Sequence, residues 1–359
     1  FNDKYSGPVQ PHHITKLVEV PFTSDGAEFN VLQDPNGGQA IDVGFLPTVD
    51  APVPPAGSNV GANPSSLSNY KLHAVYPWEI SYFPYNFKNP TVGPIFKQHY
   101  FRQAFQDLVD QEGIINGPLH GYGKVGIGPV ADYPVTSYLS PTMAKKGDPW
   151  TLNIPEARSL LKDHGWTRPA GSTAPLSCTN PGPGANQCGP GVPAGAQLSF
   201  DFIYRSGQDF MESAARELES NASLVGINIH LTAEPFGQVV GTAFDPQHPG
   251  AWQLAEWGSW TYDPDYLPTG ETLFATDAGN NAGGYSSPKN DSLIHDTLVA
   301  PTTKAFDQAM YNWQEYLANQ LPVVYMPNRP VLTEVINGLD IGVQNSALTI
   351  TPEMWFYRK

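Results

Sequence analysis

The chain has 359 residues, 40% of them hydrophobic and 12% aromatic, a composition that indicates a globular protein long enough for more than one domain. Its 34 acidic and 19 basic residues give a formal net charge of −15. A field of that sign repels phosphate backbones, which argues against a nucleic-acid-binding protein. No apolar run approaches the roughly 18 residues that a membrane-spanning helix needs.

The first half of the chain predicts short strands and two amphipathic helices. The longest helical pattern, over 96–116, places Phe101, Phe105 and Leu108 on one stripe. Residues 49–69 are rich in Pro, Ser, Gly and Asn and are typical of an exposed loop. The other expected elements are strands over 14–20, 41–45 and 78–86, and helices over 27–32 and 155–164.

A Pro- and Gly-rich segment at 167–197 shows little periodicity, and we interpret it as a surface excursion rather than a linker between domains. It holds both cysteines of the chain, Cys178 and Cys188. Two thiols are too few for a structural zinc site, and no histidine lies in this segment. The loop favours a Cys178–Cys188 disulfide, which would indicate an oxidising compartment, over the alternative of free thiols.

The second half of the chain alternates strands with helices. A strand over 198–204 precedes a helix over 208–224, Gly226 ends that helix, and Ile227, Ile229 and Leu231 alternate as the next strand. This β-α-β succession predicts a parallel strand pair in an α/β layer. Beyond it the sequence predicts strands over 252–260 and 322–326 and helices over 292–298 and 303–319.

Catalytic and metal-binding signatures are missing from the sequence, which has no Gly-x-Ser-x-Gly elbow, His-Glu-x-x-His helix or phosphate loop. His12 and His13 form a tempting metal pair. Adjacent residues of a strand point to opposite faces, so the two rings would rarely share one ion. We therefore expect no metal and no cofactor.

The segment 256–266 is the most unusual part of the sequence, because it places four aromatic and three acidic residues around a turn after a strand. Aromatic faces with a few acids suit a cleft that holds an organic ligand. Asp263 and Asp265 could instead cap the turn while the aromatic residues fill core. A third reading makes the two carboxylates the acid and base of a hydrolase.

The order of short motifs along the chain resembles the cluster 5 extracellular solute-binding proteins, which serve dipeptides, oligopeptides, nickel chelates and some sugars. The helix motif Phe101-Arg102-Gln103-Ala104 and the turn Tyr262-Asp263-Pro264-Asp265 are similar to those of the family. The resemblance also rests on Asn2–Tyr5, Ala40–Val43, Tyr85-Asn86, Gly121–Gly123, Pro155–Ala157 with Gly165-Trp166, Gly284–Pro288, and Leu321–Pro327.

The resemblance implies an α/β fold of the periplasmic-binding-protein-like, two-lobed cluster C type, with one lobe complete and the other partial. The expected second lobe is 73–325, and the expected parts of the first lobe are 1–72 and 326–359. It further implies a monomeric, non-enzymatic receptor that delivers its ligand to the permease of an ABC importer. The location is expected to be extracytoplasmic, either periplasmic or lipid-anchored through an N-terminal part that the chain lacks.

Two departures from the peptide-binding members bear on the ligand. Those members pair the ligand's amine with an Asp just before the Asp-Pro turn, where this chain has Trp260. They can also use a basic residue after the strand at 198–204, a role that Arg205 could fill. Losing the partner of a buried ammonium weakens binding, so an oligosaccharide or a chelate stands beside a peptide as the expected ligand.

Ligands of open α/β sheets bind beyond the carboxyl ends of strands, where two segments of this chain meet. We therefore predict that Trp257, Trp260, Tyr262 and Asp263 line the ligand face, with Arg205 opposite them. Two other functions stay open: a secreted hydrolase using Asp263 and Asp265, and a surface adhesion or signalling module that kept the receptor fold.

Overall fold

The computed structural model describes residues 14, 16–38, 40–55, 60–262, 267–342 and 351–358. The chain folds as two compact units, each made of separate stretches of sequence. The first unit comprises Phe1–Trp78, Ile115–Gly123 and Arg329–Lys359, and the second comprises Glu79–Ile114 and Lys124–Asn328. The chain therefore passes between the units at 78/79, 114/115, 123/124 and 328/329.

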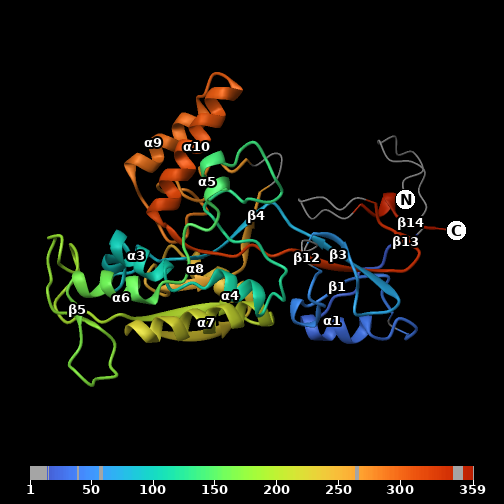
Figure 1. Cartoon of the computed structure of the whole chain (residues 1–359), viewed down its shortest axis with the longest axis horizontal. Helices are drawn as coiled ribbons and strands as arrows, with labels where there is room; N and C mark the ends of the chain where they lie inside the picture. Colours follow the sequence, from blue (N-terminus) through green and yellow to red (C-terminus); the bar gives the residue numbers. More distant parts are fainter. Residues whose placement is uncertain are drawn as a thin grey trace. The chain divides into compact units, whose positions relative to one another are not determined.

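The first unit is built on an antiparallel sheet with the strand order β1-β12-β3-β2 (Figure 1). The strands are β1 (Val43–Phe45), β2 (Gly61–Asn63), β3 (Tyr70–Val75) and β12 (Val331–Ile336). Helix α1 (Asp25–Leu32) contacts β1 and begins after Ser24, whose hydroxyl accepts a hydrogen bond from Ala27 N–H. Two short 3-10 helices, Thr48–Asp50 and Pro352–Met354, belong to the same unit. A buried apolar cluster holds the unit together: Leu46, Ala51, Leu72, Ala74, Tyr122 and Leu332.

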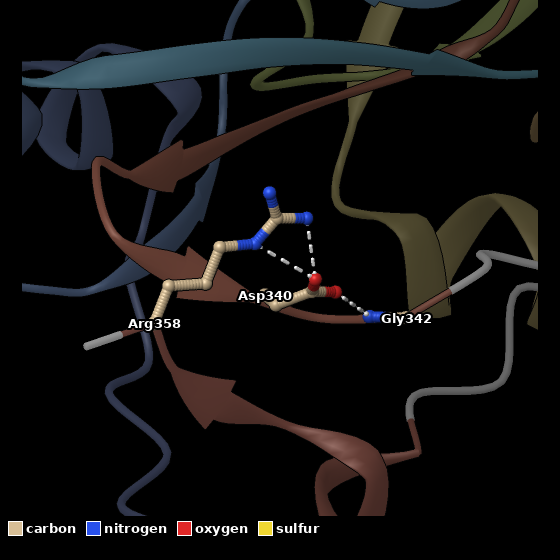
Figure 2. A network of polar contacts seen from close by, with 3 residues as sticks. All are labelled: Asp340, Gly342 and Arg358. Carbon is tan, nitrogen blue, oxygen red and sulfur yellow. Dashed lines mark hydrogen bonds and ion pairs between the residues drawn. The ribbon is translucent and has the colours of Figure 1, made fainter.

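Near the C-terminus, β13 (Leu339–Asp340) pairs with β14 (Phe356–Tyr357). A network of polar contacts around Asp340 lies beside this pair (Figure 2). The guanidinium of Arg358 donates from Nε and Nη2 to Asp340 Oδ2 at 3.1 and 2.6 Å, and Gly342 N–H donates to Oδ1 at 2.9 Å. The Arg358 hydrogen bonds are the main reason why the pKa of Asp340 is lowered. The network ties the last described residues to the strand before them.

The first unit departs from the sequence-based expectations in two ways. Residues 16–20 form no strand, so the strand predicted over 14–20 is wrong for the part that is described, and the strand predicted over 41–45 shortens to β1. Strands β3 and β12 were not predicted. They pair residues as distant as Val75 and Val331, and this long-range pairing leaves little local signal beyond the alternating burial of β3.

The second unit contains the predicted parallel pair, because β7 (Ser199–Arg205) pairs in parallel with both β8 (Asn228–Glu234) and β9 (Leu254–Glu256). Helix α7 (Asp209–Val225) connects β7 to β8 and ends at Gly226, whose φ of 85° is the left-handed conformation that glycine adopts easily. The β-α-β prediction is confirmed.

A second, antiparallel sheet of this unit has the order β10-β4-β11. Its strands are β4 (Glu79–Pro84), β10 (Ser259–Thr261) and β11 (Val323–Met326). An isolated antiparallel bridge between Tyr85, directly after β4, and Leu254 of β9 connects the two sheets. The three residues of β9 and every residue of β4 and β11 are buried, as strands covered on both faces should be.

Some helices of the second unit pack against these sheets, and others pack against each other. Helices α9 (Pro288–Leu298) and α10 (Thr303–Gln320) lie side by side (Figure 1). The remaining helices are α2 (Gly93–Phe96), α3 (His99–Gln106), α4 (Gln111–Asn116), α5 (Pro141–Lys146), α6 (Ile154–Asp163) and α8 (Phe236–Ala243), of which α4 ends in the first unit. None of the helices in the described part of the chain is both long and apolar enough to cross a membrane.

Two predicted elements are each divided in the structure. The helix expected over 96–116 becomes α3 and α4, because Asp110 caps α4 by accepting a hydrogen bond from Gly113 N–H. The carbonyl of Leu108, in the gap between them, accepts from the side chain of Asn221 instead of continuing a helix. The strand expected over 252–260 becomes β9 and β10, with Gly258 at φ 123° between them.

The segment at 167–197 forms the predicted disulfide between Cys178 and Cys188. Its short strands, β5 (Trp166–Thr167) and β6 (Ser177–Cys178), pair with each other. The segment is also anchored to α3, because the Tyr100 hydroxyl donates to the carbonyl of Cys188 at 2.7 Å and accepts from the indole N–H of Trp166. The excursion is therefore fixed to the second unit at its disulfide.

Candidate ligand-binding site

The candidate site lies at the carboxyl ends of the three parallel strands. In the register of the sheet, Arg205 at the end of β7 is opposite Glu234 of β8, and Tyr204 is opposite Glu256 of β9. Parallel strands end at one edge, so the segments that follow them must gather there. These segments contain Phe236, Trp257 and Gly258.

Arg205 lies beside the turn between β9 and β10. A Cβ placed on Gly258 would be 3.9 Å from its Nη1, so the guanidinium lies near this turn. The guanidinium also lies over the ring of Phe236, with Cζ 5.2 Å from the ring centroid, within the range of a cation–π contact. In the described part of the chain no carboxylate oxygen lies within 4.0 Å of Arg205.

Trp257 and Trp260 are both half-buried but are held differently. The ring of Trp257 packs edge-on against Tyr82 at 6.3 Å and against Phe244 at 5.4 Å, which fixes its position at the end of β9. Trp260 lies in the middle of β10, opposite Ile80 of β4. The two rings therefore belong to the frame of the site and still have exposed area for a ligand.

Strand β10 is fixed by a buried carboxylate that the sequence did not single out. Glu79, only 6% exposed, accepts hydrogen bonds from the hydroxyls of Ser259 at 2.6 Å and Thr261 at 3.4 Å. Hydrogen bonds to a carboxylate are stronger than those between neutral groups, so they should hold the strand that carries Trp260.

The other predicted site residues are placed differently. Tyr262 is 1% exposed and its hydroxyl donates to the carbonyl of Pro129 at 2.9 Å, so in this structure its ring is packing rather than surface. Asp263, and with it Asp265 of the hydrolase hypothesis, lies outside the described residues.

Sequence reasoning missed Phe236, which is 51% exposed at the start of α8. The signal available was its position, directly after the strand at 228–234 and a proline. Within the described residues no group of three or more His, Cys, Asp or Glu side chains could hold a metal ion, and His12 and His13 lie outside those residues.

Residues 35–279, which include every predicted site residue, match the profile of the bacterial extracellular solute-binding proteins, family 5 Middle. The chain belongs to this family. The expectation from the sequence motifs is therefore confirmed, and this family is one of solute-binding proteins rather than enzymes. No curated protein sequence matches the chain significantly.

Solved structures of binding proteins resemble this family member in fold. The oligopeptide-binding protein AppA from Bacillus subtilis, in complex with a nonapeptide, matches with a TM-score of 0.72 and 17% identity over 94% of this chain and 59% of AppA. Lactococcal OppA with an endogenous peptide has a TM-score of 0.68 and 15% identity over 90% of this chain and 57% of OppA. NikA from Brucella suis with Fe(III)-EDTA has a TM-score of 0.66 and 15% identity over 92% of this chain and 60% of NikA.

These likenesses confirm the predicted cluster C fold, and at such identities they show the fold alone. The chain spans only 57–60% of the length of the three solved proteins. The ligand and the transport role of the whole protein are therefore proposals.

Proposed function

We propose that this family member is part of an extracytoplasmic receptor that delivers a carboxylate-bearing ligand, a peptide or a metal chelate, to the permease of an ABC importer. Its family is one of extracellular solute-binding proteins, and relatives of the same fold hold peptides or a metal chelate in their solved structures. The disulfide agrees with an oxidising location, either the periplasm or the outer face of the membrane with a lipid anchor.

The observation that carries the choice of ligand is the surroundings of Arg205. Its guanidinium stands at the strand ends, where ligands of open α/β sheets bind, and no described carboxylate oxygen lies within 4.0 Å of it. Guanidinium groups bind carboxylates through two parallel hydrogen bonds. A peptide C-terminus and a carboxylate chelate both supply that group, whereas a neutral oligosaccharide does not.

In the proposed site the exposed faces of Phe236, Trp257 and Trp260 provide apolar contact area around Arg205. Aromatic side chains offer such area at small entropic cost. Tyr262 supports the site from within the core, and Asp263 is proposed to lie at its rim. The second unit is proposed to be the complete lobe, the first unit part of the other lobe, and the receptor a monomer.

The test is a binding measurement on the whole protein as its gene encodes it. Mass spectrometry of small molecules that copurify with it would identify candidate ligands, and calorimetry would give their affinities. Arg205→Met is expected to weaken binding by about 2 kcal/mol or more, since it removes a charged hydrogen-bond partner. Arg216→Met is the matched control, because Arg216 is an exposed arginine of α7 paired with Glu212.

The aromatic contribution is tested separately. Trp260→Ala is expected to cost about 1–3 kcal/mol in binding. Unchanged affinity in both Arg205→Met and Trp260→Ala would remove the strand-end edge from the site. Cleavage of model glycosides by the whole protein would instead support the hydrolase alternative.

A further inference from the structure

The second unit contains a cavity of about 220 Å³ that is separate from the strand-end site. Its walls come from three segments, 86–88, 243–252 and 278–282. None of Arg205, Trp257 and Trp260 lines it, although Phe244, which does, also packs against Trp257. A cavity of this size has room for a small molecule such as one substituted ring, but not for a peptide.

The walls of the cavity are held together by the side-chain amides of Asn86 and Asn281, whose donors are occupied by backbone carbonyls. Asn86 Nδ2 donates to the carbonyls of Pro249 at 2.7 Å and Trp252 at 2.9 Å, and its Oδ1 accepts from Lys88 N–H. Asn281 Nδ2 donates to the carbonyls of Ala275 and Tyr285. These bonds preorganise the cavity and leave its binding chemistry to other groups.

Two charged side chains line the cavity, Asp245 and Lys88, and they differ in their hydrogen bonds. Asp245 is occupied, because Oδ2 bonds His248 Nδ1 at 2.7 Å and Oδ1 accepts from Gln247 N–H at 2.8 Å. Lys88 has no carboxylate oxygen within 4.0 Å in the part of the chain that the structure describes. Among the described residues, the cavity therefore offers one ammonium group without a bonded partner, beside a carboxylate that already accepts two hydrogen bonds.

The stem of Lys88 is seated in a slot made by a glycine. A Cβ on Gly284 would lie 2.2 Å from Lys88 Cε, and the φ of 70° at Gly284 is a conformation that other residues rarely adopt. The glycine thus makes room for the methylene chain of Lys88, which is itself an exposed residue. Phe244, Pro246, Pro249 and Trp252 also line the cavity and give it apolar surface.

We infer that this cavity binds a small organic carboxylate with an apolar body, whose carboxylate pairs with the Lys88 ammonium while the body packs against Phe244 and Trp252. A cation and aromatic side chains that line one cavity are what such a molecule requires. The inference is independent of the receptor function, because it concerns a different cavity.

The probe for this site is 4-fluorophenylacetate, observed by ¹⁹F NMR with the full chain. Saturable line broadening with a Kd of about 1 mM is expected for so small a ligand. The amine 4-fluorophenethylamine, with the same ring and the opposite charge, is expected not to bind. Lys88→Met keeps the aliphatic part of the side chain and should weaken the binding of 4-fluorophenylacetate about tenfold. Lys289→Met, a change to an exposed lysine outside the cavity, should leave this affinity unchanged.

A blocking variant tests the place of binding. A Cβ on Gly279, which lines the cavity, meets no atom within 4 Å, so Gly279→Leu should fill the space without strain and abolish binding. Gly237→Leu is the control, since that position on α8 is equally open but lies outside the cavity. Circular dichroism would verify that each variant folds. No saturable binding up to about 10 mM, or equal binding in Lys88→Met or in folded Gly279→Leu, would overturn the proposal.

Discussion

The side chain of Gln106 in α3 forms hydrogen bonds with the backbone of the edge strand β11, and the contribution of these bonds to stability can be measured. Its Nε2 donates to the carbonyl of Tyr325 at 3.0 Å, and its Oε1 accepts from Tyr325 N–H at 2.8 Å. The side chain is 0% exposed, so water cannot replace either bond. One side chain thus satisfies both backbone groups that the edge strand leaves open at this residue.

The perturbation is Gln106→Met, which preserves the length of the side chain and removes both hydrogen bonds. Each buried group left without a partner costs about 1–3 kcal/mol. Two such groups, partly offset by the greater apolarity of methionine, lead us to expect a loss of about 3 kcal/mol in the free energy of unfolding. The control is Gln103→Met, on a half-exposed residue of the same helix, with an expected change within about 0.5 kcal/mol.

The assay is urea unfolding followed by circular dichroism, together with hydrogen exchange of the peptide that contains β11. Loss of the Gln106 acceptor should speed exchange of Tyr325 N–H even under native conditions. A loss below about 1 kcal/mol with unchanged exchange at β11 would refute the reasoning, because it would mean that neither bond matters to stability.

Two further predictions concern charged groups of the second unit. Arg102, which is 4% exposed, donates hydrogen bonds to the carbonyls of Phe96 and of Gln320 at the end of α10. Arg102→Met should therefore lower the free energy of unfolding in urea by about 2–4 kcal/mol. A variant as stable as the original would mean that the desolvation cost of the guanidinium outweighs its hydrogen bonds. Burial, reinforced by the charge of Asp110, raises the pKa of Glu217 from 4.5 to about 7. The folded state therefore binds this proton more tightly than the unfolded state does, and stability should be lost as the pH rises from 4.5 through 7. Glu217→Gln should therefore raise the free energy of unfolding by about 1–2 kcal/mol at pH 8, after allowance for partial exposure, and by little at pH 4.5. An equal gain at the two pH values, or the same pH profile in Glu219→Gln, would contradict this prediction.

The sequence alone predicted those parts of the molecule whose signal is local. The β7-α7-β8 unit follows from alternation, helical periodicity and Gly226, all within about 37 residues of one another. The disulfide follows from two cysteines in one short loop, and family membership from the order of motifs. Even the approach of Arg205 to the segment that contains Trp257 was predictable, because both follow parallel strands.

Only the tertiary structure decided the features that depend on distant partners. The carbonyl of Leu108, just after α3, accepts a hydrogen bond from Asn221, over 100 residues away. Tyr262 is buried because Pro129 offers it an acceptor, although its sequence context resembles that of a ligand-contact residue. The Lys88 cavity exists only because three separate segments meet. Local sequence largely determines the secondary structure of a segment. Which of its side chains are buried, and which polar groups pair, depends on residues that are distant in the sequence and packed against it.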